Sequence, residues 1–323
     1  MCQAVLELKG LIFVVLGMVA GLGCAALQHP SLLTDRESPI AWSEVLVGAE
    51  YIRDEECSQC HRELVIPFQK TVHARLADFE IPEGYRKGCQ SCHGPGSRHV
   101  EDRDRRKIAY YTNLSPAERD QRGQICLGCH RGSPHIHWYG SAHPMNGITC
   151  MDCHNPHKTE ARRLLREEDP ELCFGCHAEK QAQMNYPSRH PLREKKIQCA
   201  DCHNPHDATN VSLLKETTVN QLCFRCHPEK EGPFTFEHAP VTESCTICHD
   251  PHGTTANHLL RESEPFLCME CHANHASGEL SFLQDVLDVP AKREAFFTRC
   301  TQCHSQIHGT DLPGTTGRGV FTR

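Results

Sequence analysis

The sequence predicts a fold with little regular secondary structure, in which short helices and loops are wrapped around covalently bound groups. Three observations predict it. Only 38% of the 323 residues are hydrophobic and 6% are aromatic, whereas 22 are cysteine and 24 are histidine. One short cysteine–histidine pattern recurs along the chain. Shared among the copies of this pattern, the chain has roughly thirty residues for each copy, which is too few to bury a core of side chains.

The first residues predict export from the cytoplasm. Lys9 precedes the apolar run Leu11–Gly23, which is short for a transmembrane helix and is typical of a signal peptide. Cys24 follows directly and is a candidate for lipid modification. Three outcomes therefore stay open: cleavage of the leader, a lipid anchor at Cys24, or retention of the apolar segment. In each case we expect the rest of the chain to leave the cytoplasm.

The charge balance argues against nucleic acid as a partner. The formal net charge is −7, and an acidic exported chain lacks the basic surface that nucleic-acid binding needs. The run Arg98–Lys107 mixes both signs and is most simply a solvated surface.

The recurring pattern is Cys-x-x-Cys-His, which occurs ten times. Apart from Cys2 and Cys24, which fall in or beside the leader, it includes every cysteine of the chain. The cysteine pairs are Cys57 and Cys60, Cys89 and Cys92, Cys126 and Cys129, Cys150 and Cys153, Cys173 and Cys176, Cys199 and Cys202, Cys223 and Cys226, Cys245 and Cys248, Cys268 and Cys271, and Cys300 and Cys303.

This pattern is the attachment signature of c-type haem, because two thiols bind the porphyrin and the next residue places its imidazole on the iron. Disulfides and zinc ribbons also use paired cysteines, but neither requires a histidine after every second cysteine. The sequence therefore predicts ten covalently attached c-type haems. Their proximal iron ligands are His61, His93, His130, His154, His177, His203, His227, His249, His272 and His304.

The spacing of the motifs shows an internal repeat whose unit is a pair of motifs. From Cys126 to Cys268 the first cysteines lie 22 to 26 residues apart. A Leu-Leu-basic-Glu phrase follows each unit, at Leu164–Glu167, Leu213–Glu216 and Leu259–Glu262. We divide the chain into a leader (1–24), a linker (25–50), a decahaem domain (51–309), which forms one array or two pentahaem halves, and a flexible tail (310–323).

Histidines outside the motifs supply one candidate distal ligand for each iron. They are His73, His99, His143, His157, His190, His206, His238, His252, His275 and His308. His157, His206 and His252 follow their own motif histidines too closely to reach the far side of the same haem. We therefore expect these three to bind the iron of a neighbouring haem.

Two histidines on each iron leave no position for a substrate, so we expect electron transfer and no catalytic residues. The predicted fold class is a multihaem cytochrome c, with short helices and loops around an elongated chain of ten haems. One clear helix start is the capping box at Ser115–Glu118, which has proline at the first helical position.

With these motifs laid out, the chain resembles the decahaem cytochromes of the MtrA/DmsE type from about Val47 to Gly309. The specific elements, besides the ten motifs, are GCQSCHGPGSRHV (88–100), WYGSAHPMNGITCMDCHNPH (138–157), SRHP (188–191) and CTQCHSQIHG (300–309). The resemblance implies an elongated haem wire without catalytic activity. It also implies an outer-membrane β-barrel porin as partner, a periplasmic or inner-membrane electron donor, and an outer-surface multihaem cytochrome or terminal reductase as acceptor.

Two other functions are weighed against this one. A multihaem reductase would need one iron with an open face. A subunit of an extracellular cytochrome filament would take one ligand from the next subunit. Both depend on an incomplete set of distal ligands, so the state of the irons distinguishes them from a closed electron carrier.

Overall fold

The computed structural model describes residues 46–78, 88–132, 135–158, 161–210, 212–272, 299–302 and 304–312. The chain divides into two compact units, Met1–Ala41 and Trp42–Arg323, and all of the described residues belong to the second. The predicted leader and Cys24 therefore lie outside the described residues, as do His275 and Cys303. In the described ranges, short helices, turns and isolated β-bridges occur but no strand.

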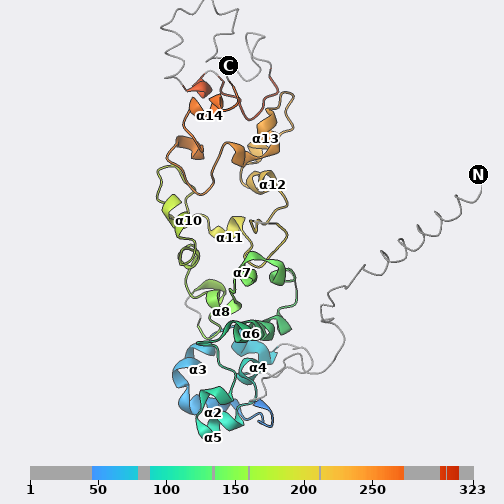
Figure 1. Cartoon of the computed structure of the whole chain (residues 1–323), viewed down its shortest axis with the longest axis vertical. Coiled ribbons are helices and arrows are strands. Elements are labelled where there is room, and N and C mark those ends of the chain that lie inside the picture. The colour runs from blue at the N-terminus through green and yellow to red at the C-terminus, as the bar shows by residue number, and fades with distance from the viewer. Residues whose placement is uncertain are drawn as a thin grey trace, which may run out of the picture. The chain divides into compact units, whose positions relative to one another are not determined.

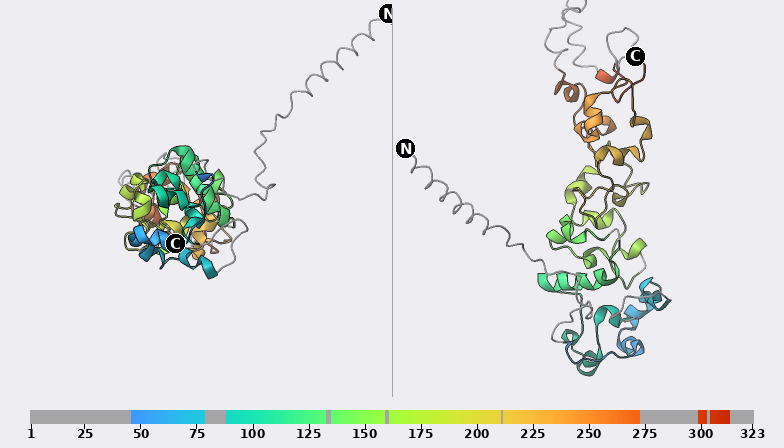
Figure 2. Two further views of the ribbon diagram at one scale, coloured as in Figure 1. Left: turned by 90° about the horizontal axis from the view of Figure 1, so that it is seen from below. Right: turned by 90° about the vertical axis from the view of Figure 1, so that its right-hand side faces the viewer.

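The α-helices are α2 (Asp54–Cys60), α3 (Arg62–Phe68), α4 (Gln90–His93), α5 (Ser97–Asp102), α6 (Pro116–Cys129), α7 (Ala142–Met145), α8 (Cys150–Cys153), α9 (Glu171–Phe174), α10 (Ala178–Gln183), α11 (Cys199–Cys202), α12 (Val219–Phe224), α13 (Ala239–Glu243) and α14 (Phe266–Met269). The 3₁₀ helices are η2 (His73–Asp78), η3 (Arg105–Lys107), η4 (Trp138–Gly140), η5 (Arg162–Leu164), η6 (Pro228–Lys230), η7 (Cys245–Ile247), η8 (Asn257–Leu259) and η9 (Cys300–Gln302). Within the second unit, the elements run along the long axis from α2 and α5 near one end to α13 and α14 near the other (Figure 1). The end-on view shows them gathered into a narrow cross-section (Figure 2).

Side-chain caps start several of the helices. The predicted capping box of α6 is confirmed: the Ser115 N–H donates to the Glu118 carboxylate at 2.8 Å, and Pro116 is the first helical residue. Thr149 and Asp152 start α8 in the same way. Most of the helices are shorter than two turns, so their own hydrogen bonds cannot stabilise them. Their positions must be fixed by what their side chains bind.

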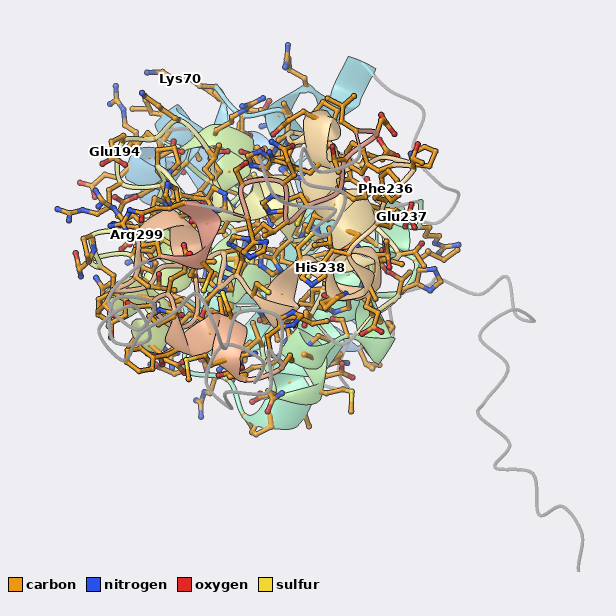
Figure 3. The ribbon with its side chains drawn as sticks, turned by 90° about the horizontal axis from the view of Figure 1, so that it is seen from above. Lys70, Glu194, Phe236, Glu237, His238 and Arg299 are labelled. Carbon is orange, nitrogen blue, oxygen red and sulfur yellow. The ribbon has the colours of Figure 1, made fainter. Side chains whose placement is uncertain are left out.

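The described residues contain few buried apolar side chains. They are spread along the unit and are Leu46, Ala109, Ile125, Trp138, Ala161, Met184, Leu192 and Ala256. Conversely, Leu64 and Ile66 are about half exposed beside Cys60 and His61. Viewed along the unit, Lys70 and Glu194 lie at the rim, whereas His238 lies nearer the middle (Figure 3). The described residues thus have few buried aliphatic contacts, as expected of a chain that wraps bound groups.

Both flanks of the predicted decahaem domain pack against it. Leu46 is only 4% exposed. The Ser97 N–H donates a hydrogen bond to the Glu50 carbonyl (3.1 Å), and the Glu50 N–H donates one to the Ser97 hydroxyl oxygen (2.8 Å). At the other end, Thr310 forms an antiparallel bridge with Phe236. The packed unit therefore includes residues 46–50 and 310–312. None of the helices in the described ranges combines the length and the apolarity needed to span a bilayer.

Candidate haem-binding sites

The ten Cys-x-x-Cys-His motifs share one backbone hydrogen bond. In each, the histidine N–H donates to the carbonyl of the first cysteine, at 2.8 to 3.1 Å. One helical turn therefore separates the first thiol from the imidazole. The turn places the two thiols and the imidazole as one group that covalent attachment of a porphyrin and ligation of its iron require.

The imidazoles of the motifs are paired across the structure. Nine motif histidines face one of the predicted distal ligands, and His130 in addition lies 5.5 Å from His135, which is not among the predicted ligands. The ring-centre distances are 6.1 Å for His61 and His99, 5.9 Å for His93 and His157, 6.1 Å for His130 and His73, 6.0 Å for His154 and His206, 6.3 Å for His177 and His143, 6.1 Å for His203 and His252, 6.5 Å for His227 and His190, 6.1 Å for His249 and His308, and 6.0 Å for His272 and His238.

This separation fits a metal ion bound between two imidazoles. Two metal–nitrogen bonds of ~2.0 Å each, with about 1.1 Å from each nitrogen to its ring centre, require about 6.2 Å. Rings in direct edge-to-face contact can have similar centre distances, so the recurrence of this separation between motif histidines and candidate distal histidines carries the argument. The donor set and its spacing therefore fit six-coordinate haem iron with two histidine ligands.

None of these nine motif histidines is paired with the histidine that follows its own motif. His157 follows the fourth motif but faces His93 of the second motif, and the rings are 11° from parallel. His206 and His252 likewise face the motif histidine two motifs earlier, His154 and His203. The odd-numbered motifs from the third to the ninth show the reverse pattern, because their partners follow the motif two places before.

In eight of the nine pairs, a backbone carbonyl orients one of the two rings. A carbonyl only accepts hydrogen bonds, so the Nδ1 atom must be the donor, and Nε2 is then free to face the partner ring. The motif histidines held in this way are His93, His154, His203 and His249, on the carbonyls of Ala109, Arg163, Ser212 and His258. The distal ones are His99, His143, His190 and His238, on the carbonyls of Asp104, Pro205, Pro251 and Ile307.

The pair of His73 and His130 is different. The Nδ1 atom of His73 is buried and has no hydrogen-bond acceptor among the described residues. In the repeats of His143 and His190, the acceptor is the proline carbonyl of an Asn-Pro-His or Asp-Pro-His phrase. His73 therefore has less second-shell support than the other distal candidates.

The thiols of successive motifs lie close together in a regular alternation. First thiols contact each other within five motif pairs: Cys57 and Cys89, Cys126 and Cys150, Cys173 and Cys199, Cys223 and Cys245, and Cys268 and Cys300. Second thiols interact electrostatically between the pairs: Cys92 and Cys129, Cys153 and Cys176, Cys202 and Cys226, and Cys248 and Cys271. Consecutive motifs are therefore spatial neighbours from the first to the tenth.

Comparison with known proteins agrees with this geometry. The family described as the doubled CXXCH motif matches residues 143–182, 190–232 and 238–277. The chain is also 33% identical over 264 residues to multiheme cytochrome MtrA of Shewanella baltica (strain OS185), which covers 80% of this chain and 79% of the relative. The chain belongs to the MtrA family of multihaem cytochromes.

Membership of the MtrA family confirms the predicted fold class, a multihaem cytochrome c built from short helices and loops. It also identifies the paired motifs as attachment sites of covalent c-type haems and the protein as an electron-transfer cytochrome.

Burial lowers the pKa of several of the paired imidazoles in this MtrA-family protein. It lowers the pKa of His93, His206 and His308 to about 4. An imidazole binds iron through the lone pair of its neutral form. These side chains are therefore ready to act as ligands at physiological pH.

The sequence did not reveal what orients the motif histidines. The Leu-Leu-basic-Glu phrase pairs with the motif: His154 bridges Leu165, His203 bridges Leu214, and His249 bridges Leu260. The residue before each phrase supplies the carbonyl that receives the Nδ1–H bond. Arg163 and His258 reach this position with φ values of 59° and 60°, which non-glycine residues rarely adopt. The recurrence of the phrase was the signal for this role.

Proposed function

We propose that the chain holds ten c-type haems, each with two histidine ligands, and conducts electrons along them. The observation that carries this proposal is the set of nine imidazole pairs at 5.9 to 6.5 Å, in which every pair joins a motif histidine to a candidate distal histidine. The alternating thiol contacts support it, because groups attached to adjacent thiols are neighbours in one continuous row.

When bound, each haem supplies a one-electron couple. Two histidines of the chain would hold each iron, which would leave no position for a substrate. The Nδ1–H bonds to carbonyls make the imidazoles more basic and fix their orientation. His304 is the remaining motif histidine, and we assign His275 as its partner because it is the remaining candidate.

We further propose that the protein is exported and acts between a periplasmic or inner-membrane donor and an outer-surface cytochrome or terminal reductase, inside an outer-membrane porin. Its membership of the MtrA family and its apolar leader support this setting. Density-gradient fractionation of cells tests it. We expect the haem-stained protein in the outer-membrane fraction together with a porin. Recovery in shed fibres would instead favour a filament subunit.

Low-temperature electron paramagnetic resonance of the oxidised protein, quantified per chain, tests the ligation. We expect ten low-spin irons and no high-spin signal. A stoichiometric high-spin iron would overturn the closed arrangement. It would favour a reductase with one open haem, or a ligand donated by a second subunit.

A further inference from the structure

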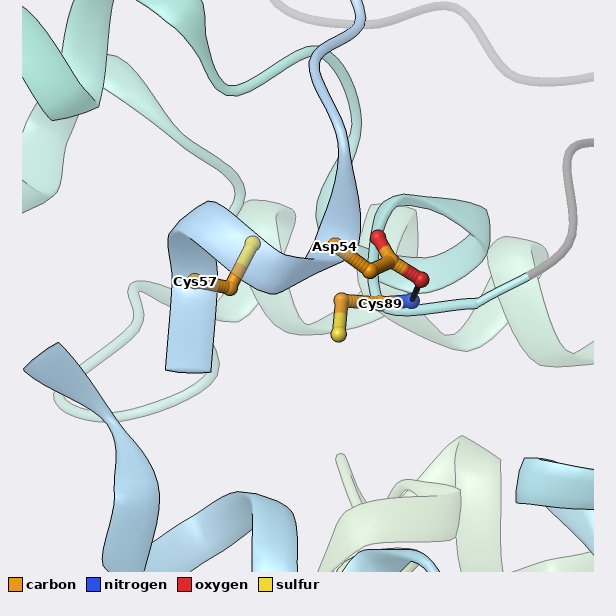
Figure 4. Close-up of side chains that lie close together, drawn as sticks. All are labelled: Asp54, Cys57 and Cys89. Carbon is orange, nitrogen blue, oxygen red and sulfur yellow. Dashed lines mark hydrogen bonds between the residues drawn. The ribbon is translucent and has the colours of Figure 1, made fainter. Parts of the chain in front are cut away.

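One side chain bridges the two motifs of each pair at four of the five contacts between first thiols. Asp54, three residues before Cys57, accepts a hydrogen bond from the Cys89 N–H at 3.1 Å (Figure 4). Asp169 accepts from the N–H groups of Cys199 (2.9 Å) and Ala200 (3.0 Å). A residue three or four positions before the odd-numbered motif thus caps the start of the even-numbered motif.

The same arrangement recurs at two more contacts. Glu264 accepts from the Thr301 N–H at 2.8 Å and from the Thr301 hydroxyl at 2.9 Å. Asn220 accepts from the Cys245 N–H at 2.8 Å. The geometry is conserved between these repeats, but the charge is not, because Asn220 is a neutral amide.

Three of these caps place a carboxylate against both first thiols. One carboxylate oxygen and the two sulfur atoms all lie within 4.8 Å of one another in the groups of Asp54, Asp169 and Glu264. No such group forms in the described residues around Cys126 or Cys223. At the contact of Cys126 with Cys150, the two positions from which the caps come are taken by Gly123 and by Arg122, which is 5% exposed.

The sites are shaped to bring the carboxylate close. Gly88, which precedes Cys89, has a φ of +84°, and a Cβ atom there would collide with the Asp54 carboxylate. Asp169 is only 8% exposed. A carboxylate with two nearby thiols can bind a metal ion, but these thiols become thioethers when haem is attached and lose the thiolate that a metal needs.

The negative charge is not needed for the cap itself. Asparagine and aspartate cap helices about equally well, and Asn220 does so here. A fixed charge has a second effect beside a redox group, because the oxidised iron carries one more positive charge than the reduced iron. A nearby carboxylate stabilises the oxidised form and lowers the reduction potential, most strongly where burial limits screening.

We propose that Asp54, Asp169 and Glu264 are redox-tuning residues that lower the potentials of the haems attached at their thiol contacts. This inference rests on the proposed function. The first, third and fifth motif pairs would then have low potentials, and the second and fourth, at Cys126 with Cys150 and Cys223 with Cys245, would have high ones. The reduction potential therefore alternates between low and high values from one motif pair to the next.

Spectroelectrochemical titration of the haem-loaded protein tests the proposal. In each of the single variants Asp54→Asn and Asp169→Asn, we expect the reduction potentials of two haems to rise, which appear as two components of the titration curve. Their ratio of oxidised to reduced haem at a fixed potential should change by about tenfold, which is 59 mV for a one-electron couple. The combined variant with Glu264→Gln should move six components. Asn220→Asp should move two components the other way.

Two controls keep the test sharp. Glu179→Gln removes a carboxylate that is 81% exposed and is not part of a carboxylate–thiol group, and it should leave every potential unchanged. Haem content and low-spin signals should stay at wild-type levels in all variants. Unchanged potentials in both aspartate variants, with full haem content, would overturn the proposal. Asn220 also donates to the Val241 carbonyl, so if Asn220→Asp loses haem, the aspartate variants decide.

Failure of the tuning role and failure of the proposed function give different results. An iron count below ten, or a high-spin iron in the wild type, would contradict the proposed function without changing the comparison between variants. A full set of low-spin irons with unmoved potentials would contradict only the tuning role.

Discussion

The imidazole rings of His93 and His157 lie 5.9 Å apart and 11° from parallel, although His157 belongs to the fourth motif and His93 to the second. The pairs of His154 with His206 and of His203 with His252 repeat this relationship. Each pair therefore links two motifs that are not consecutive in the sequence. A substitution at one histidine is expected to act on a distant motif.

Replacing His157 by alanine should open the iron of the second motif and leave that of the fourth motif closed. Electron paramagnetic resonance should show one new high-spin iron per chain. Tyr111 packs edge-on against His93 at 5.3 Å, and Trp138 lies 6.1 Å from His206. Adding Tyr111→Phe should alter the new signal, whereas adding Trp138→Phe should not. The opposite response would assign His157 to the fourth motif.

The haem of His130 should have the weakest distal ligand, because the buried Nδ1 of His73 lacks an acceptor among the described residues. We expect this haem to be reduced first in a redox titration. His73→Met should replace it by one histidine/methionine haem with a sulfur-to-iron charge-transfer band and a higher potential. His99→Met at the first motif is the matched comparison. If His73→Met shifts a low-potential component instead, the assignment is wrong.

Stability should fall as the solution becomes acidic. Burial lowers the pKa of His93, His206 and His308 to about 4, below the value of about 6.5 in an unfolded chain. The unfolded chain therefore binds more protons between these values. The stabilisation is complete above about pH 6.5 and is lost as the pH falls toward 4. Thermal unfolding followed by haem absorbance should give a constant melting temperature from pH 7 to 8 and a falling one below pH 6.5. A flat profile down to pH 4 would contradict it.

The cap of α6 should contribute to stability without affecting haem attachment. Ser115→Ala removes one partner of the capping box and should cost about 1 kcal/mol of unfolding free energy. Ser115→Asn keeps an acceptor and should restore most of it. Denaturant titration measures the loss, and the haem content should be equal in all three proteins. A loss of haem from Cys126 and Cys129 in Ser115→Ala would show that the cap also positions the motif.

Much of the site could be predicted from the sequence because the chemistry is local. Two thiols and an imidazole within five residues define each attachment site, and the histidines left over supply the partner rings. The pairing itself could not be predicted. His157 lies close to His154 in the sequence, but the stacking of repeats places it against His93. The role of the Arg163 and Pro205 carbonyls as acceptors for histidine Nδ1–H groups could not be predicted either, because every residue has a backbone carbonyl and the sequence does not show which ones accept.

The interlaced pairing sets an order of maturation for a chain that emerges from its amino terminus. When the motif of His177 or His227 appears, its partner, His143 or His190, has already been made. The motif of His154 must wait for His206, which arrives two motifs later. A chain interrupted between Cys150 and His206 would thus hold the iron at His154 through one imidazole only, and this state would distinguish an incomplete chain from a complete one.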